Sequence, residues 1–324
     1  MDDGHPADDD SITASPADAD ATFADMGSSS IVELSPRSSA KKRATWPFVI
    51  GIVAVLAAAV GAIAVAAGGD GHKVSTLAQA AAKTEGQHSA RVEFTTSVPL
   101  AGFSGKEILV TGEYDFDRRI LHYDFDITEL MKTTTPDAPP GAGKITAKAQ
   151  GLTVFMKMGI FDQEPKLKGK WMKLDIGKQV SNFGVDLDKV AEFEAAGPAS
   201  ALAKLQTLLG SVETLGTEDV RGVKTTHYRA TYDFAQVYRA RGAVTDEAAF
   251  AKLLDLYSST TATSEAWVDN DGLVRRTVNS IPLKAGVQTV KAEFFDFGIA
   301  VNVAVPSEAD TFSVDDLQAL ARGK

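Results

Sequence analysis

The sequence predicts an α+β protein in which helices cover one face of a large antiparallel sheet, preceded by one transmembrane helix. Over most of the chain after residue 90, apolar and polar residues alternate with the period of two that is typical of half-buried strands. Short turn sequences separate these segments, and such turns join antiparallel neighbours. Several other segments follow a helical period. Because both kinds of element are amphipathic, the helices must cover the apolar face of the sheet.

The first 45 residues are expected to form a disordered, acidic, cytoplasmic tail. Residues 1–40 contain nine acidic residues and one basic residue, Arg37. Their few apolar residues follow no period, so the segment cannot bury enough surface to offset the entropy lost on ordering. Docking or phosphorylation at the serines of 28–30 and 35–39 is an alternative role for the tail.

Residues 46–67 carry no charge and are predicted to span the cell membrane once. A helix of this length measures about 33 Å, enough for a hydrocarbon core of about 30 Å. The basic residues 41–43 precede it, which places the tail in the cytoplasm and the rest of the chain outside. A cleaved signal peptide ending near 64–66 and a buried core helix are the alternatives. Residues 68–73 then form a linker to an extracytoplasmic domain, residues 74–324.

The first half of that domain is expected to be one helix followed by a meander of strands. Leu77, Ala81 and Ala82 lie at helical spacing behind Ser75, which can cap the helix. A loop rich in Thr, Pro, Gly and Ala at 133–143 interrupts the strands. The helix is expected at 74–83 and the strands at 92–98, 108–115, 121–127, 145–150, 152–160 and 171–176.

The second half mixes helices with further strands. Thr245 is expected to cap its clearest helix, whose apolar face carries Phe250, Leu253 and Leu254. Residues 269–272 read Asp-Asn-Asp-Gly, which predicts a hairpin turn rather than a calcium loop, because the further ligands are missing. Helices are expected at 185–195, 198–209, 234–241, 245–257 and 314–321, and strands at 212–215, 225–234, 265–268, 273–278, 287–297 and 300–303.

The residues that catalysis or metal binding requires are scarce. The chain has no cysteine, which excludes disulfides, cysteine-ligated zinc, iron–sulfur clusters and a thiol nucleophile. Its five histidines do not lie at metal-binding spacing, and no nucleophile elbow, dinucleotide turn or phosphate loop is present. A net charge of −10 disfavours nucleic acid as a partner. The sequence therefore predicts a non-enzyme without catalytic residues, metal or cofactor.

Two polar sites are the possible exceptions. His227 alternates with Tyr228 on its strand, so we expect it to face outward in a structural or surface role. Asp124 and Asp126 share one side of a strand and could form a general acid and base. Exposed carboxylates on a solvated face are the favoured interpretation.

The apolar side of the sheet is the remaining candidate for a functional site. It can be an ordinary core, which the pattern alone favours, or it can line a lipid-sized cavity if the sheet curves. Met156 and Met158 are adaptable side chains that suit varied apolar ligands.

Four segments then carry motifs in a specific order. Residues 212–228 read V-E-T-L-G-T-E-D-V-R-G-V-K-T-T-H-Y, 168–171 read K-G-K-W with Leu174 following, 266–276 read A-W-V-D-N-D-G-L-V-R-R, and 295–298 read F-D-F-G before the valines and proline of 301–306. Together, over about 75–310, they resemble conserved stretches of actinobacterial lipoproteins of the LppX/LprG type.

This resemblance implies a fold similar to the LolA and LolB lipoprotein carriers. That fold is a large curved antiparallel sheet, a half-barrel, with helices covering its concave face. Members of the family bind or move lipids and lipoglycans outside the cytoplasmic membrane. The lipobox cysteine of the lipoproteins is missing here, so the expected anchor is the helix 46–67 itself.

The expected function is binding of a lipid or hydrophobic ligand in the cell envelope, in lipid or lipoprotein transport. The expected partners are a lipid or acylated glycolipid, the membrane and an envelope protein. An envelope sensor or interaction module that signals through the cytoplasmic tail is the alternative. Ligand contacts are expected from Phe94, Val110, Tyr123, Phe125, Val154, Met156, Met158, Tyr232 and Phe294.

Overall fold

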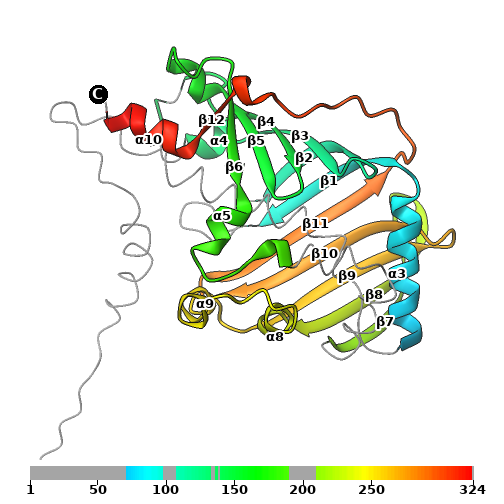
Figure 1. Cartoon of the computed structure of the whole chain (residues 1–324). Helices are drawn as coiled ribbons and strands as arrows, with labels where there is room; N and C mark the ends of the chain where they lie inside the picture. Colours follow the sequence, from blue (N-terminus) through cyan, green and yellow to red (C-terminus); the bar gives the residue numbers. More distant parts are fainter. Residues whose placement is uncertain (1–70, 98–106, 133–135, 138, 190–208, 323–324) are drawn as a thin grey trace, which may run out of the picture. The chain divides into compact units, whose positions relative to one another are not determined.

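The described part of the chain is built on one twelve-stranded sheet (Figure 1). The structure is a computed structural model, and it describes residues 71–97, 107–132, 136–137, 139–189 and 209–322.

Several expectations fall outside these residues. They are the tail 1–45, the transmembrane helix 46–67, residues 190–195 of the helix expected at 185–195 and residues 198–208 of the helix expected at 198–209. Among the helices that the structure describes, none is long and apolar enough to cross a membrane.

Contacts divide the chain into two units. Residues 43–317 form one of them and contain the whole sheet. Residues 1–42 and 318–324 form the other, of which only the end of one helix is described.

The expected strands and helices are largely present, and most strands extend a few residues beyond the expected limits. The strands are β1 Ser89–Ser97, β2 Glu107–Asp115, β3 Ile120–Asp126, β4 Lys144–Gln150, β5 Thr153–Met158, β6 Trp171–Asp175, β7 Leu209–Val220, β8 Val223–Asp233, β9 Thr261–Asp269, β10 Val274–Leu283, β11 Gly286–Phe295 and β12 Thr311–Ser313. The helices are α3 Gly71–Glu85, α4 Thr128–Met131, α5 Ile176–Ser181, α8 Phe234–Ala240, α9 Glu247–Leu254 and α10 Val314–Arg322, with short 3₁₀ turns η2 Gly159–Gln163 and η3 Glu308–Asp310.

Two meanders meet in the middle of the sheet, whose strand order is β12-β6-β5-β4-β3-β2-β1-β11-β10-β9-β8-β7. Strands β1 to β6 follow one another outward on one side, and β7 to β11 return from the other edge until β11 pairs with β1. These pairs are antiparallel, as expected, but β12 pairs with β6 in parallel. The sheet is therefore mixed, and the prediction of a purely antiparallel sheet is wrong at this edge. In Figure 1 the strands β4 to β6 run steeply and β9 to β11 run at a slant, so the sheet is strongly twisted.

The segment that carries the chain from β11 to β12 was expected to form a strand at 300–303, and this prediction is wrong. Arg118 donates from Nη1 to the carbonyl oxygen of Val303 at 2.8 Å and from Nη2 to that of Val301 at 3.0 Å. Lys148 donates from Nζ to the carbonyl oxygen of Ala304 at 2.7 Å. Side chains thus take the backbone acceptors that a neighbouring strand would otherwise use. We call residues 299–307 the strap.

Aspartates begin most of the short helices. The last residues of β6 and β8, Asp175 and Asp233, accept hydrogen bonds from the first-turn amides of α5 and α8. Asp246, not the expected Thr245, caps α9 by accepting from the amides of Ala248 and Ala249. A strand that ends in Asp therefore passes directly into a helix, because the carboxylate satisfies amides that have no partner inside the helix.

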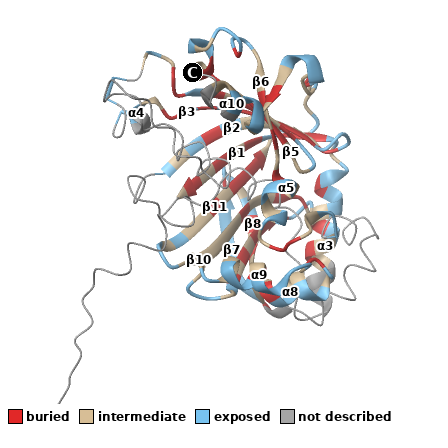
Figure 2. Ribbon diagram, turned by 60° about the vertical axis from the view of Figure 1, so that its left-hand side comes forward, coloured by how far each residue is buried: buried red, intermediate tan, exposed pale blue. Residues whose placement is uncertain are grey.

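Helix α3 packs against β9 and β10 through Leu77, Ala80 and Thr84, all buried. The hydroxyl of Thr84 accepts a 2.8 Å hydrogen bond from the amide of Val274 and so holds the start of β10. Another small core joins Val185 and Ala235 to Phe250 of α9, which is completely buried. Figure 2 shows that the buried residues are otherwise concentrated on the strands.

Candidate ligand-binding face of the sheet

The register of the strands places all nine predicted ligand contacts on one face of the sheet, which we call the inner face. Side chains of directly paired residues point to the same side, and alternate residues along a strand share that side. Phe94 pairs with Val110, so these two side chains share a side. The same reasoning, carried from strand to strand through the paired residues, places the other seven on that side as well. Eight of the nine are buried, and Tyr232 is half-buried.

One row of the inner face is apolar across eight neighbouring strands, from β11 to β12. Gly112 occupies the place next to Tyr123 in this row because an added Cβ atom would lie 2.2 Å from the carbonyl oxygen of His122. The row runs Phe294, Val92, Gly112, Tyr123, Ala147, Met156, Met172 and Phe312.

Small side chains occupy part of the inner face of strands β8, β9 and β11, between larger residues such as Tyr228 and Val290. The small side chains are all buried, although an alanine side chain reaches little beyond the backbone. Another layer, whether protein or ligand, can therefore approach these strands closely. The small residues are Ala230, Ala262, Ser264, Ala266 and Ala292.

Among the described residues, four polar atoms on this face are buried and have no hydrogen-bond partner. They are the hydroxyls of Thr96, Thr277 and Tyr123 and Nδ2 of Asn279. Burial raises the pKa of Tyr123 well above its ordinary value and raises the pKa of Tyr232 to about 12, so both phenols are neutral.

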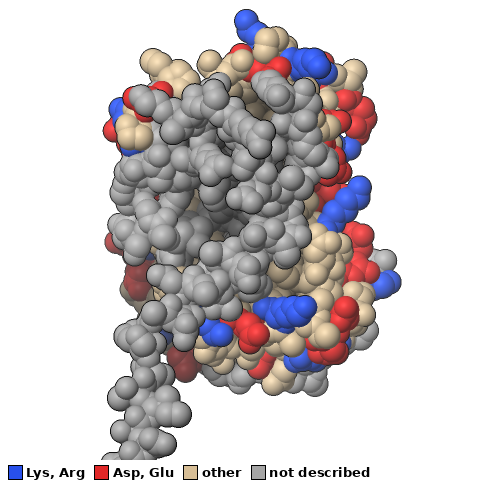
Figure 3. All heavy atoms as spheres, turned by 90° about the vertical axis from the view of Figure 1, so that its left-hand side faces the viewer, with Lys and Arg blue, Asp and Glu red and all other residues tan. Residues whose placement is uncertain are grey.

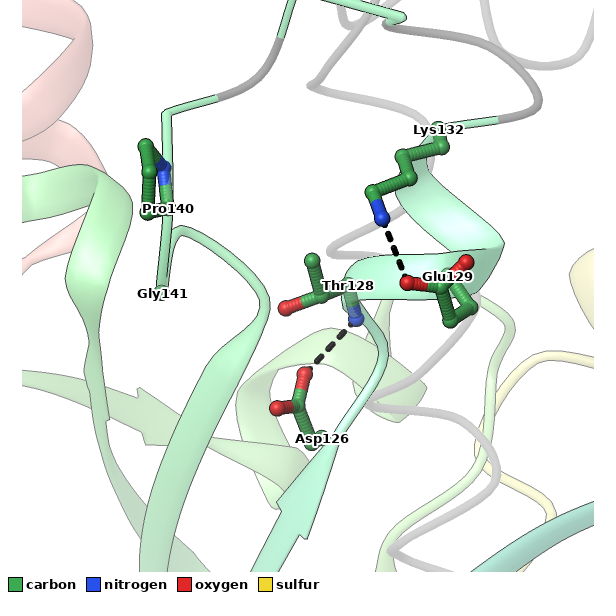
Figure 4. A pocket seen from close by; sticks show the side chains of 6 residues that line it. All are labelled: Asp126, Thr128, Glu129, Lys132, Pro140 and Gly141. Carbon is green, nitrogen blue, oxygen red and sulfur yellow. Dashed lines mark hydrogen bonds and ion pairs between the residues drawn. The ribbon is translucent and has the colours of Figure 1, made fainter.

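Two neighbouring pockets lie at the end of β3 to β5. The first has a volume of about 540 Å³ and is drawn in Figure 4, where the Asp126 carboxylate turns to the Thr128 amide and Lys132 pairs with Glu129. The first pocket is lined by Asp126, Thr128, Glu129, Lys132, Pro140 and Gly141.

The second pocket, of about 700 Å³, shares Asp126 and two other residues with the first. Phe125, Ile145 and Met158 of the inner face line it, together with Lys157 and other polar residues. Two of the predicted ligand contacts, Phe125 and Met158, thus border an open pocket.

Asp124 and Asp126, the candidate acid and base pair, already accept hydrogen bonds from neighbouring residues. Asp124 accepts a 2.6 Å hydrogen bond from the hydroxyl of Thr146. Asp126 accepts from Thr128, and these hydrogen bonds lower its pKa. A general acid needs a raised pKa, so Asp126 does not suit that role. Within the described residues, no group of three His, Asp or Glu side chains is placed to hold a metal ion.

On the opposite, outer face, His227 lies between two carboxylates. Its Nδ1 is 3.0 Å from Glu218 and its Nε2 is 2.7 Å from Glu265, which also binds Arg229. Trp267 donates to Glu218 at 2.9 Å, and this bond is the main cause of the lowered pKa of Glu218. His227 does face away from the apolar side as expected, but it is 6% exposed rather than on the surface.

A second charged group adjoins it on the outer face. Glu293 accepts from Arg276 at 2.9 Å and from Arg221 at 2.8 Å, and Arg221 also pairs with Glu93. Burial favours a higher pKa for Glu293, but these cations outweigh burial and hold its pKa below the ordinary value. Both groups are internally paired, which is typical of structural networks.

Charged side chains of both signs are interspersed on the described part of the view in Figure 3. That part of the surface shows no extended area of one sign, whether basic or acidic.

No family model matches the chain. An uncharacterized 31.2 kDa protein in the rplA-rplJ intergenic region of Streptomyces griseus is 38% identical over 117 residues, which are 35% of this chain and 37% of that protein. The chain thus spans little more than a third of the length of that relative.

Two solved structures are similar at low identity. Mycobacterium tuberculosis lipoprotein LppX has a TM-score of 0.40 and 16% identity, with 71% of this chain and 97% of LppX covered. LprF from Mycobacterium bovis has a TM-score of 0.39 and 12% identity, with 72% and 96% covered.

Proposed function

We propose that this chain is a membrane-anchored protein whose extracytoplasmic domain binds a lipid or another apolar ligand on the inner face of the sheet. The observation that carries the proposal is the inner face itself. An apolar row crosses eight strands, and a group of small residues on β8, β9 and β11, which we call the floor, lies beside it. An acyl chain on this face would lie close to the backbone of the sheet, because the side chains of the floor are short.

The gain from burial is large enough for such a role. Each CH₂ group removed from water contributes about 0.8 kcal/mol. One acyl chain of ordinary length therefore supplies on the order of 10 kcal/mol before the costs of association are subtracted. The second pocket, bordered by Phe125 and Met158, is the proposed entrance.

The test is native mass spectrometry and lipid extraction of the full chain purified in a mild detergent. The wild type is expected to retain lipid after detergent removal. Ala266→Leu, which fills the floor, is expected to lose most of it. Thr263→Leu lies on the same strand, on the outer face, and serves as the matched control. Repeated wild-type preparations without lipid would end the proposal.

The anchor and orientation are proposed from the sequence, with residues 1–45 in the cytoplasm and the sheet outside. The absence of cysteine allows a clean test with single-cysteine variants. A membrane-impermeant maleimide is expected to label Ser258→Cys in intact cells and to leave Ser29→Cys unlabelled until the cells are lysed. The reverse pattern would refute the orientation.

A further inference from the structure

Three of the unpartnered polar atoms on the inner face lie together on the central strands. They belong to Thr96 of β1 and to Thr277 and Asn279 of β10. Thr96 and Thr277 are 2% and 3% exposed, so water does not satisfy their hydroxyls. Buried polar atoms nearly always have a partner, and three without one on a single face need an explanation. We call these residues the polar patch.

The strand register fixes the size of the patch. Val290 of β11 pairs with Thr96 on one side and with Asn279 on the other. Thr96 and Asn279 are therefore two strand spacings apart, about 10 Å. Thr277 lies two residues from Asn279 on the same strand, about 7 Å away. A ligand that satisfies all three must carry more than one polar atom, spaced over several ångströms.

The hydrogen-bonding roles within the patch are partly set. Oδ1 of Asn279 accepts a 2.7 Å hydrogen bond from the hydroxyl of Ser264, which leaves Nδ2 as an unused donor. The two threonine hydroxyls can each donate as well. The patch therefore offers three donors and is best matched by a ligand that supplies acceptor oxygens.

The strands around the patch do not favour a charged acceptor. The two rows of paired residues that contain the patch carry no Asp, Glu, Lys or Arg, so these rows supply no counter-ion to a buried carboxylate or phosphate. These rows run Val212, Ala230, Ser264, Asn279, Val290, Thr96 and Ile108, and Thr214, Tyr228, Ala266, Thr277, Ala292, Phe94 and Val110.

Resting on the proposed function, we infer that the ligand is an acyl-ester lipid whose ester carbonyls accept hydrogen bonds from Thr96, Thr277 and Asn279. Ester carbonyls are neutral acceptors, and a glycerol lipid carries two or three of them close together between its chains. The chains then lie on the apolar and small residues that surround the patch. A hydrocarbon leaves the three donors unpartnered, and a free fatty acid adds a charge that the patch cannot balance.

The experiment compares two probes that differ only in their carbonyls. Dioleoylglycerol and its diether analogue, dioleylglycerol, are offered in the same detergent micelles to the full chain, and bound lipid is measured by mass spectrometry. The wild type is expected to prefer the diester by about tenfold, the ratio that two neutral hydrogen bonds supply. The double variant Thr96→Val/Thr277→Val is expected to lose this preference and to bind the diether as the wild type does.

Two further variants make the comparison specific. Thr96→Ser/Thr277→Ser keeps both hydroxyls and is expected to keep the preference for the diester. Thr95→Val removes a hydroxyl from the outer face of the same strand and is expected to change nothing. A wild type that binds both lipids equally overturns the inference but leaves the proposed function standing. A wild type that binds neither lipid also overturns the inference, and it overturns the proposed function as well if the purified chain retains no lipid of any kind.

Discussion

The imidazole of His227 stacks on the indole of Trp267, with ring centroids 3.9 Å apart and planes inclined by 15°. The two residues are directly paired on β8 and β9, so the ladder itself brings the rings together. Glu218 accepts one hydrogen bond from the indole and lies beside Nδ1 of the imidazole. The stacked pair thus fastens the edge strand β7 to its neighbours from the outer face.

Removing the imidazole is expected to destabilise the fold. His227→Ala loses both the stacking and the contacts with two carboxylates, and we expect a loss of about 2–3 kcal/mol in the free energy of unfolding. His227→Phe keeps a stacked ring and should lose about half as much. Denaturant unfolding of the full chain measures both values. His122→Ala is the control, because His122 is partly exposed and lies 3.6 Å from Asp124, so little change is expected. Equal stability of all three variants would contradict a structural role for His227.

The ionisation of Glu293 is expected to make the free energy of unfolding depend on pH. Although burial opposes ionisation, the hydrogen bonds and charges of Arg276, Arg221 and Lys291 keep its folded-state pKa below the ordinary value of 4.5. The carboxylate of Glu293 therefore binds a proton more tightly in the unfolded chain than in the folded one. Its ionised form stabilises the fold above about pH 4.5, and this contribution is lost as the pH falls through the folded-state pKa. Glu293→Gln is expected to be less stable than the wild type near neutral pH. Its stability should also fall less between about pH 5 and 3, and parallel curves for the two proteins would refute this account.

The strands could be predicted because their period of two is a local property of the sequence. The inner face followed from the same pattern, and all nine predicted contacts lie on it. Whether they contact a ligand stays a prediction. The alternation at 300–303 led to a wrong prediction because a strand also needs a neighbouring strand to pair with. Here Arg118 binds the carbonyl oxygens of Val301 and Val303, and Lys148 binds that of Ala304. Long-range pairs of this kind leave no local signal.

The burial of His227 and the existence of the polar patch could not be predicted from the sequence either. The burial of His227 depends on Glu218 and Glu265, which lie on the two strands that flank β8. The polar patch depends on a register in which Val290 separates Thr96 from Asn279. By contrast, the cap of α9 was misplaced by one residue, and Asp246 was a detectable signal because Asp is among the best capping residues.

The strap should loosen when Arg118 is replaced. Arg118→Ala removes two hydrogen bonds to strap carbonyls, and we expect faster hydrogen exchange of backbone amides in 299–313, including β12. The remaining sheet should keep its protection, and the midpoint of unfolding should fall only slightly. Lys166→Ala removes an exposed cation elsewhere and is the control. Unchanged exchange in the strap would show that Arg118 does not hold it.

Gly112 is expected to tolerate no side chain. An added Cβ atom would lie 2.2 Å from the carbonyl oxygen of His122 and 2.9 Å from Cβ of Tyr123, so β2 and β3 would have to separate. We expect Gly112→Ala to cost more than about 2 kcal/mol in unfolding free energy. Gly151→Asn is the matched control, because Gly151 has open space around it and a φ of +57°, which asparagine accepts. A stable Gly112→Ala protein would mean that the two strands can part without cost.

The polar patch is expected to strengthen lipid binding while it lowers the stability of the lipid-free protein. In the ligand-free protein the hydroxyl of Thr96 is buried without a partner, which costs about 1–3 kcal/mol. Thr96→Val replaces it with a methyl group of similar shape, so we expect the lipid-free variant to be more stable than the wild type by about 1 kcal/mol. Thermal unfolding after exhaustive delipidation measures this difference, and Thr95→Val should show no gain. With dioleoylglycerol bound, the order should reverse, because the wild type then gains the linkage free energy of tighter binding. A Thr96→Val protein that is less stable without lipid would show that the hydroxyl already has a partner within the protein.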